Sequence, residues 1–104
     1  MKSLEQLPIK IDPVRVAQFC RDRGIRKMSL FGSVVRDDFD PGISDVDVLV
    51  EFLPGALEGV GLNYFDYSED LAEILGRKVD LCHQLNKYIW PLVKHELTPI
   101  YEQA

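Results

Sequence analysis

The sequence is poor in cysteine and histidine. Its 104 residues include two cysteines, too few for the disulfide framework that holds a small secreted domain together. Cys20 and Cys82 each lie in an apolar pattern, so we expect both to be buried thiols. His83 and His95 lack the company of further metal-ligand residues, so we expect structural or surface positions for both.

Long apolar runs and an excess of positive charge are also missing. Without an apolar run or a signal-peptide pattern, we expect a soluble cytoplasmic protein with no membrane contact. The 12 Lys and Arg residues face 17 Asp and Glu residues, which gives a formal net charge of −5. Direct binding of DNA or RNA needs a cationic surface, so we do not expect nucleic acid as a ligand. A basic protein partner suits this charge better.

What is present fits one small domain over residues 1–104, with residues 1–10 as a loose arm. The hydrophobic fraction of 46% is ordinary for a globular protein and allows one core. No repeat, linker or low-complexity segment is visible.

Residues 45–52 alternate in the manner of a half-buried strand. The alternation separates two sets: Val46, Val48, Val50 and Phe52 on one face, and Asp45, Asp47, Leu49 and Glu51 on the other. Asp45 and Asp47 then lie about 7 Å apart and project into the same space. Two like charges on one strand face repel, and divalent cations would neutralise them. The alternative is that both are ordinary solvent-facing strand residues.

A second motif, Gly32-Ser33, follows the apolar pair Leu30-Phe31. We expect the strand to end there and a turn to lead into a short helix through Arg36. Glycine lets the backbone approach a ligand closely, and a helix start presents free N–H groups to an anion. With the Ser33 hydroxyl and the Arg36 charge, this turn is a candidate phosphate cradle. The alternative is a turn glycine followed by an ordinary N-cap serine.

A third carboxylate, Asp80, lies in a short predicted strand over residues 78–82. If Val79 and Leu81 face the core, Asp80 points to the same side as Asp45 and Asp47. Three aspartates on neighbouring strands beside a phosphate cradle indicate a two-metal phosphoryl-transfer site.

Together these motifs resemble a known family. FGS-x-x-R (residues 31–36), SDVD (44–47) and the later VDL (79–81) look like the nucleotidyltransferase fold of the DNA polymerase beta superfamily. The short chain is similar to its smallest branch, the minimal nucleotidyltransferases. The resemblance covers about residues 27–80, and residues 85–101 also resemble that branch.

The resemblance implies which residues would bind the ATP donor, the metal ions and the acceptor hydroxyl. Gly32 and Ser33 would hold the triphosphate of ATP. Asp45 and Asp47 would hold two Mg²⁺ ions, with Mn²⁺ as an alternative. Asp80 would help to bind one metal and activate the acceptor hydroxyl.

Two further residues near these motifs complete the predicted ATP site. We assign Arg36 and Ser44 to nucleotide binding, beside the Gly-Ser and Asp-x-Asp motifs.

Local signals predict the other elements. Asp12 and Pro13 would begin a first helix as N-cap and N1 residues, and Gly24 would end it. The further expected elements are a strand over 26–31, a turn-rich loop over 37–43, a connector over 54–61, a helix over 62–75, a turn over 86–90 and a helix from near Pro91. Residues 98–101 would add a short edge strand.

Two of the predicted helices have an apolar stripe that we expect to face the core. The first helix has a stripe of Val14, Ala17, Phe19 and Cys20; the second has Tyr64, Tyr67, Leu71, Ile74 and Leu75. We expect Trp90 to pack at the entry of the last helix, the alternative being exposure to a partner.

The topology follows from the position of the chemistry. Gly32 ends one strand and Asp45 begins the next, so both meet at one sheet edge only if these strands run antiparallel. The second and third strands are linked by a helix and should be parallel. We therefore expect an α/β (α+β) domain: a small mixed sheet with helices mainly on one face, the polymerase beta-like nucleotidyltransferase fold.

The chain has little beyond this catalytic core, so the acceptor must come from outside. By resemblance, the partner is a HEPN-domain toxin with ribonuclease activity. The chain would neutralise it as an antitoxin, by transferring AMP from ATP to one of its tyrosines. Two alternatives are a non-catalytic antitoxin that masks its toxin by binding, and an enzyme that modifies a small molecule such as an aminoglycoside.

Overall fold

The computed structural model describes residues 7, 9–36, 40, 45–56, 64–85 and 87–103. Their elements, in chain order, are α1 (Pro13–Arg23), β1 (Ile25–Phe31), the 3₁₀ turn η2 (Gly32–Val35), β2 (Val46–Phe52), α2 (Tyr64–Leu75), β3 (Val79–Cys82), α3 (Trp90–Val93) and β4 (Thr98–Glu102). Each strand and helix predicted from the sequence is present to within a few residues. The loop over 37–43, apart from Asp40, and most of the connector over 54–61 lie outside the described residues.

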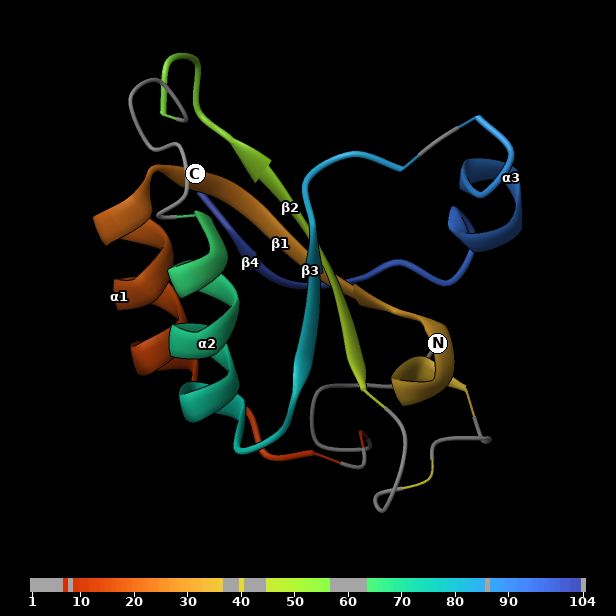
Figure 1. Ribbon diagram of the computed structural model, residues 1–104, viewed down its shortest axis with the longest axis horizontal. Coiled ribbons are helices and arrows are strands. Elements are labelled where there is room, and N and C mark those ends of the chain that lie inside the picture. Colours follow the sequence, from red (N-terminus) through yellow and green to blue (C-terminus); the bar gives the residue numbers. More distant parts are fainter. Residues whose placement is uncertain are drawn as a thin grey trace.

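One mixed sheet organises these elements, in the order β3-β2-β1-β4 (Figure 1). β1 pairs antiparallel with both β2 and β4, whereas β2 and β3 are parallel. Both predicted strand relationships are therefore confirmed, and β4 is the expected edge strand. The α/β (α+β) class with a small mixed sheet is confirmed as well.

The core lies between one face of this sheet and the pair of helices α1 and α2, which lie side by side (Figure 1). On β2, Val46, Val48 and Val50 are fully buried, as the alternation predicts. Val79 and Leu81 of β3 are also buried, at 8% exposure each. The side chains between these positions consequently project from the opposite face, which α1 and α2 leave open.

The ends of α1 follow its sequence signals. The Asp12 carboxylate accepts hydrogen bonds from the backbone N–H groups of Val14 and Arg15, at 3.0 and 3.3 Å. Gly24 ends the helix with a φ of 70°. One part of the predicted stripe is wrong, because Val14 is 73% exposed and Val16 takes its place in the core. Val14 shares the solvent-facing first turn with the cap, while Val16 is directed at the sheet.

Two residues of the predicted N-terminal arm also depart from expectation. Leu7 and Ile9 are each 7% exposed and belong to the hydrophobic core, so a loose arm is wrong for them. Burial of these two large aliphatic side chains stabilises the fold by about 1.5–3 kcal/mol each.

α2 packs through Leu71 and Leu75, with Tyr67 and Ile74 partly buried against the same core. It begins at Tyr64, so residues 62 and 63 of the predicted helix lie outside the described part of the chain. In the described residues no helix has both the length and the apolar character needed to cross a membrane.

α3 is a four-residue turn of helix between β3 and β4 and stands apart from α1 and α2 (Figure 1). Pro91 occupies its first turn, where a missing N–H costs nothing. Trp90 is 43% exposed, so the expected packing at the helix entry is wrong. A single four-residue turn is too short to enclose an indole.

Candidate active site

Two of the three predicted metal-binding aspartates lie side by side on neighbouring strands. Asp47 of β2 and Asp80 of β3 are Cα partners in the parallel ladder, where neighbouring strands lie about 4.8 Å apart. Asp45 directly precedes β2, two residues before Asp47. The three aspartates therefore lie at one edge of the open sheet face, and their role as metal ligands stays a prediction.

The electrostatics of this edge are repulsive. Burial, followed by the negative charges of Asp80 and Asp45, raises the pKa of Asp47 above its ordinary value of 3.8. Glu96 acts in the same direction, and among the described residues Arg36 opposes it. A carboxylate whose ionised form is disfavoured by two neighbouring carboxylates gains most from a cation placed among them.

The donor set fits a hard divalent cation, because carboxylate oxygens are the ligands that Mg²⁺ and Mn²⁺ prefer. Among the described residues, no group of three or more His, Cys, Asp or Glu side chains is placed to hold a metal ion. Bound cations would replace the repulsion among Asp45, Asp47 and Asp80 by attraction, which makes these three carboxylates the candidate ligands.

Gly32 is the residue at which the Gly-Ser turn approaches the Asp-x-Asp strand. It is buried, has a φ of 76° and begins η2 directly after β1. A Cβ at this position would collide with the carboxylate of Asp47. The Gly-Ser turn and the Asp-x-Asp strand, which are 12 or more residues apart in the sequence, are thus in contact.

The predicted short helix after Gly32 is only the four-residue turn η2. A single 3₁₀ turn has no developed helix dipole, so phosphate binding here would depend on individual N–H groups and on Ser33. Ser33 is half-buried, and its carbonyl accepts the backbone N–H of Arg36 at 3.1 Å. Its role toward the triphosphate stays a prediction.

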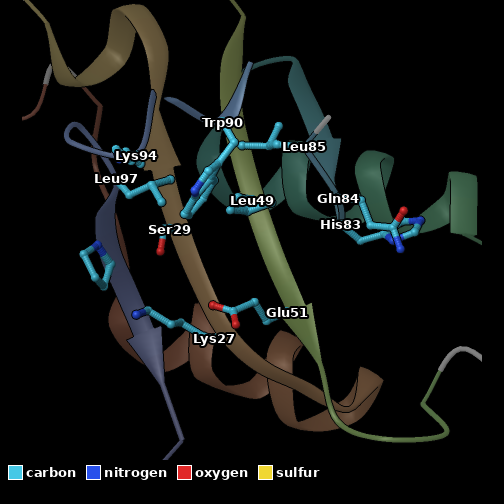
Figure 2. A pocket seen from close by; sticks show the side chains of 11 residues that line it. Lys27, Ser29, Leu49, Glu51, His83, Gln84, Leu85, Trp90, Lys94 and Leu97 are labelled. Carbon is cyan, nitrogen blue, oxygen red and sulfur yellow. The ribbon is translucent and has the colours of Figure 1, made fainter. Parts of the chain in front are cut away.

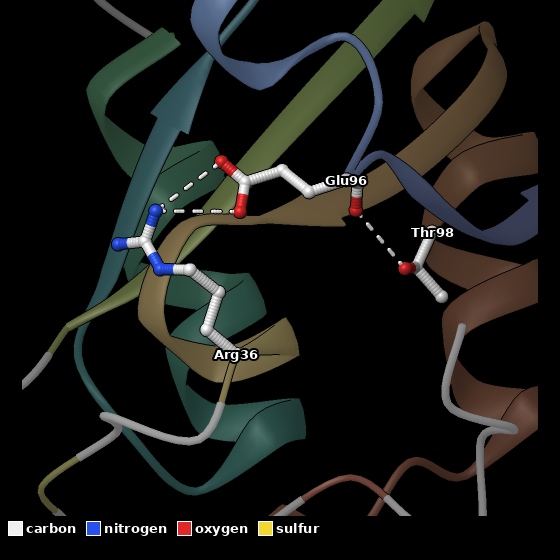
Figure 3. Close-up of polar contacts among 3 residues, drawn as sticks. All are labelled: Arg36, Glu96 and Thr98. Carbon is white, nitrogen blue, oxygen red and sulfur yellow. Dashed lines mark hydrogen bonds and ion pairs between the residues drawn. The ribbon is translucent and has the colours of Figure 1, made fainter.

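Arg36 is close enough to this edge to lower the pKa of Asp47, against the acidic neighbours that raise it. Its guanidinium donates to both carboxylate oxygens of Glu96 at 3.4 Å, and the Thr98 hydroxyl donates to the Glu96 carbonyl at 3.1 Å (Figure 3). The ion pair ties the end of η2 to the turn before β4. Ser44, the remaining predicted nucleotide-binding residue, lies outside the described residues.

A pocket of about 440 Å³ next to this edge was missed by the sequence analysis. It lies on the open sheet face, with Trp90 and Lys94 from the α3 region above Ser29 and Leu49 of the sheet (Figure 2). The available signal was the apolar run from Tyr88 to Leu92, which exceeds what a four-residue helix can bury.

Comparison with known proteins agrees with this geometry. The sequence matches the nucleotidyltransferase domain family over residues 14–98. No curated protein matches it. The fold is similar to that of a toxin-antitoxin with AMP-PNP (18% identity, TM-score 0.66) and of a toxin-antitoxin MntA-HpeT mutant (16% identity, TM-score 0.64). Each similarity covers 89% of this chain and 75% of the other, and identities this low show a shared fold alone.

The family match includes the Gly-Ser turn, the Asp-x-Asp strand and the strand of Asp80. Since it covers most of the sequence, the chain belongs to the nucleotidyltransferase domain family.

Proposed function

We propose that this chain transfers AMP from ATP to a tyrosine hydroxyl of a HEPN-domain ribonuclease toxin, and that it neutralises the toxin as an antitoxin. The observation that carries the proposal is the register of Asp47 with Asp80, beside Gly32. It supports one site in which a triphosphate, a metal and an acceptor hydroxyl can meet.

The reaction is a displacement at the α-phosphorus. The tyrosine oxygen attacks that phosphorus, the bond to the oxygen bridging the α- and β-phosphates breaks, and pyrophosphate leaves. The phenolic proton passes to the carboxylate of Asp80, which is exposed and open to an incoming protein. Divalent cations, when bound, would neutralise the phosphate charge and lower the pKa of the acceptor hydroxyl.

The predicted site residues in the described part of the chain divide into metal ligands and triphosphate contacts. Asp45, Asp47 and Asp80 would hold two Mg²⁺ ions. Gly32 would let the backbone approach the triphosphate, and Ser33 would donate its hydroxyl to it. The positive charge of Arg36 next to the same edge supports phosphate binding.

The structural neighbours support the choice of donor and partner. One of them is a toxin-antitoxin with AMP-PNP, an analogue of ATP. The other is a MntA-HpeT mutant in which two aspartates separated by one residue are replaced by glutamate, the same spacing as Asp45 and Asp47. We propose a HEPN-domain protein as the partner because the motifs of this chain resemble those of the minimal nucleotidyltransferases.

Transfer of label from ATP tests the proposal. The chain and the product of its neighbouring gene, the expected HEPN-domain partner, are incubated with α-labelled ATP and Mg²⁺, and we expect the partner to gain label and about 329 Da per AMP. The Asp45→Asn/Asp47→Asn double variant should transfer none. An unlabelled partner whose ribonuclease activity is nevertheless blocked by the double variant would favour masking by contact. Label on a small molecule alone would also overturn the proposal.

A further inference from the structure

We propose that the pocket roofed by Trp90, together with the exposed apolar residues 88–92, receives the acceptor as a tyrosine-bearing segment of a partner protein. This inference rests on the proposed function and adds the place where the partner binds. It assigns a role to a part of the chain that contains none of the predicted catalytic residues.

The pocket lies on the same sheet face as the aspartates and directly next to them. Leu49 follows Asp47 by two residues on β2, about 7 Å along the strand, and lines the pocket with its cross-strand partner Ser29. On β1 the order is Ser29, then Phe31, which pairs with Asp47, then Gly32. Asp47 therefore lies between the Gly-Ser turn and the pocket.

This order suits displacement in line. The attacking oxygen and the leaving pyrophosphate occupy opposite sides of the α-phosphorus. With pyrophosphate at Gly32 and Ser33, and the α-phosphate at the aspartates, the acceptor has to approach from the side of Leu49. Leu49 and Ser29, which line the pocket, lie on that side.

The size and lining of the pocket suit an aromatic side chain that ends in a hydroxyl. Its volume of about 440 Å³ is within the usual range of ligand sites. Trp90, Leu49 and Leu97 supply apolar surface, while Lys94 and Glu51 supply charge (Figure 2). A tyrosine side chain likewise combines an apolar ring with a polar hydroxyl at its end.

The rim of the pocket favours a protein over a small molecule. Five large hydrophobic side chains in the described part of the chain are exposed, and four of them fall within residues 88–92. Tyr88 is 74% exposed, Leu92 73%, Trp90 43% and Ile89 40%. Exposed apolar side chains gathered in one place mark an interaction surface, and aromatic residues are enriched at such surfaces.

Val14 offers a matched control for this surface. It is 73% exposed, as Leu92 is, but belongs to α1 on the covered side of the sheet. Calorimetry with the product of the neighbouring gene, the expected HEPN-domain partner, and without ATP should give about tenfold weaker binding for Leu92→Asp and for Trp90→Ala. Val14→Asp should bind as the wild type does. All three positions are solvent-exposed, so melting temperatures should stay close to that of the wild type.

Trp90 is the only tryptophan in the chain and reports on the pocket directly. Labelling with 5-fluorotryptophan gives one ¹⁹F resonance, which the unlabelled partner should shift. AMP-PNP with Mg²⁺ alone should leave it in place. A shift with AMP-PNP alone, or a KM for ATP raised by Trp90→Ala at an unchanged KM for the partner, would assign the pocket to the adenine base and overturn the inference.

The outcomes separate this inference from the proposed function. A wild-type chain that binds the partner through residues 88–92 but transfers no AMP would refute the proposed chemistry and leave the docking surface standing. Normal binding by Leu92→Asp and Trp90→Ala, with AMP still transferred, would refute the docking surface alone. A partner that does not bind the wild-type chain would refute both.

Discussion

Gly32 and Asp47 are in such close contact that no side chain fits between them: a Cβ on Gly32 would collide with the Asp47 carboxylate. The contact brings the predicted phosphate turn against the predicted metal strand. It also makes glycine necessary for two independent reasons, the missing Cβ and a φ of 76°.

A comparison of Gly32→Ala with Gly76→Ala separates the effect of the left-handed backbone from the effect of the contact with Asp47. Gly32→Ala should cost about 1–3 kcal/mol of unfolding free energy from its left-handed backbone alone. It should also reduce the rate of AMP transfer about 100-fold, because Asp47 is displaced. Gly76 has a φ of 71° and open space around it, so Gly76→Ala should show a similar stability loss at normal activity. Urea unfolding and initial rates measure the two effects; equal activity losses in both variants would contradict the contact as the cause.

Metal binding should depend on Asp47. A ligand that binds only the folded state at 100 times its Kd stabilises that state by about 2.7 kcal/mol, so saturating Mg²⁺ should raise the melting temperature. Asp47→Asn should fold but lose most of this Mg²⁺ effect. Asp66→Asn, the same chemical change at an exposed position of α2, should retain it. An undiminished Mg²⁺ effect in Asp47→Asn would remove Asp47 from the metal site.

The stability of the metal-free protein should fall with rising pH because of Asp47. Burial, then Asp80 and Asp45, raises its pKa above 3.8, so the folded state keeps a proton that the unfolded state releases. The penalty is absent below 3.8, grows as pH rises to the folded pKa, and is complete above it. Asp47→Asn cannot ionise and should gain stability relative to the wild type across this window. Urea unfolding in EDTA over a pH series would contradict this if the difference between the two proteins were constant.

Arg36 is expected to act on ATP, yet its ion pair with Glu96 allows a purely structural role. Arg36→Ala should raise the KM for ATP several-fold, because a cation next to the triphosphate is lost. Glu96→Gln removes the ion pair but keeps the cation, and should leave that KM unchanged or lower it. If both variants raise the KM equally in steady-state kinetics, Arg36 works by holding the turn before β4.

The two thiols should differ in reactivity. Burial raises the pKa of Cys20 to about 12, against the opposing charges of Arg23 and Arg21, and its side chain is fully buried. Burial and the charges of Asp80 and Asp47 raise the pKa of Cys82, but that thiol is partly exposed. Iodoacetamide at neutral pH should therefore label Cys82 slowly and Cys20 only after unfolding. Peptide mass spectrometry would refute this if native Cys20 reacted as fast as the urea-unfolded thiol.

Sequence alone determined the elements whose signals are local. Asp12, Pro13 and Gly24 mark α1 because a cap, a first-turn proline and a left-handed glycine each act within a few residues. Alternation along β2 sets which side chains face the core, because successive residues of a strand point to opposite sides. The meeting of Asp47 with Asp80 was also predictable, since the polar face of each strand is implied by its apolar one.

Only the tertiary structure decided the features that depend on contacts between distant segments. The burial of Leu7 and Ile9 and the exposure of Val14 depend on which surfaces the sheet offers, and no local pattern records that. The collision that a Cβ at Gly32 would cause involves Asp47 on another strand. Trp90 stays at the surface because the turn that carries it is too short to bury an indole, and the sheet below it forms a pocket there. Local sequence therefore determined the chemistry available to the chain, whereas long-range packing decided which residues meet and which remain open to a partner.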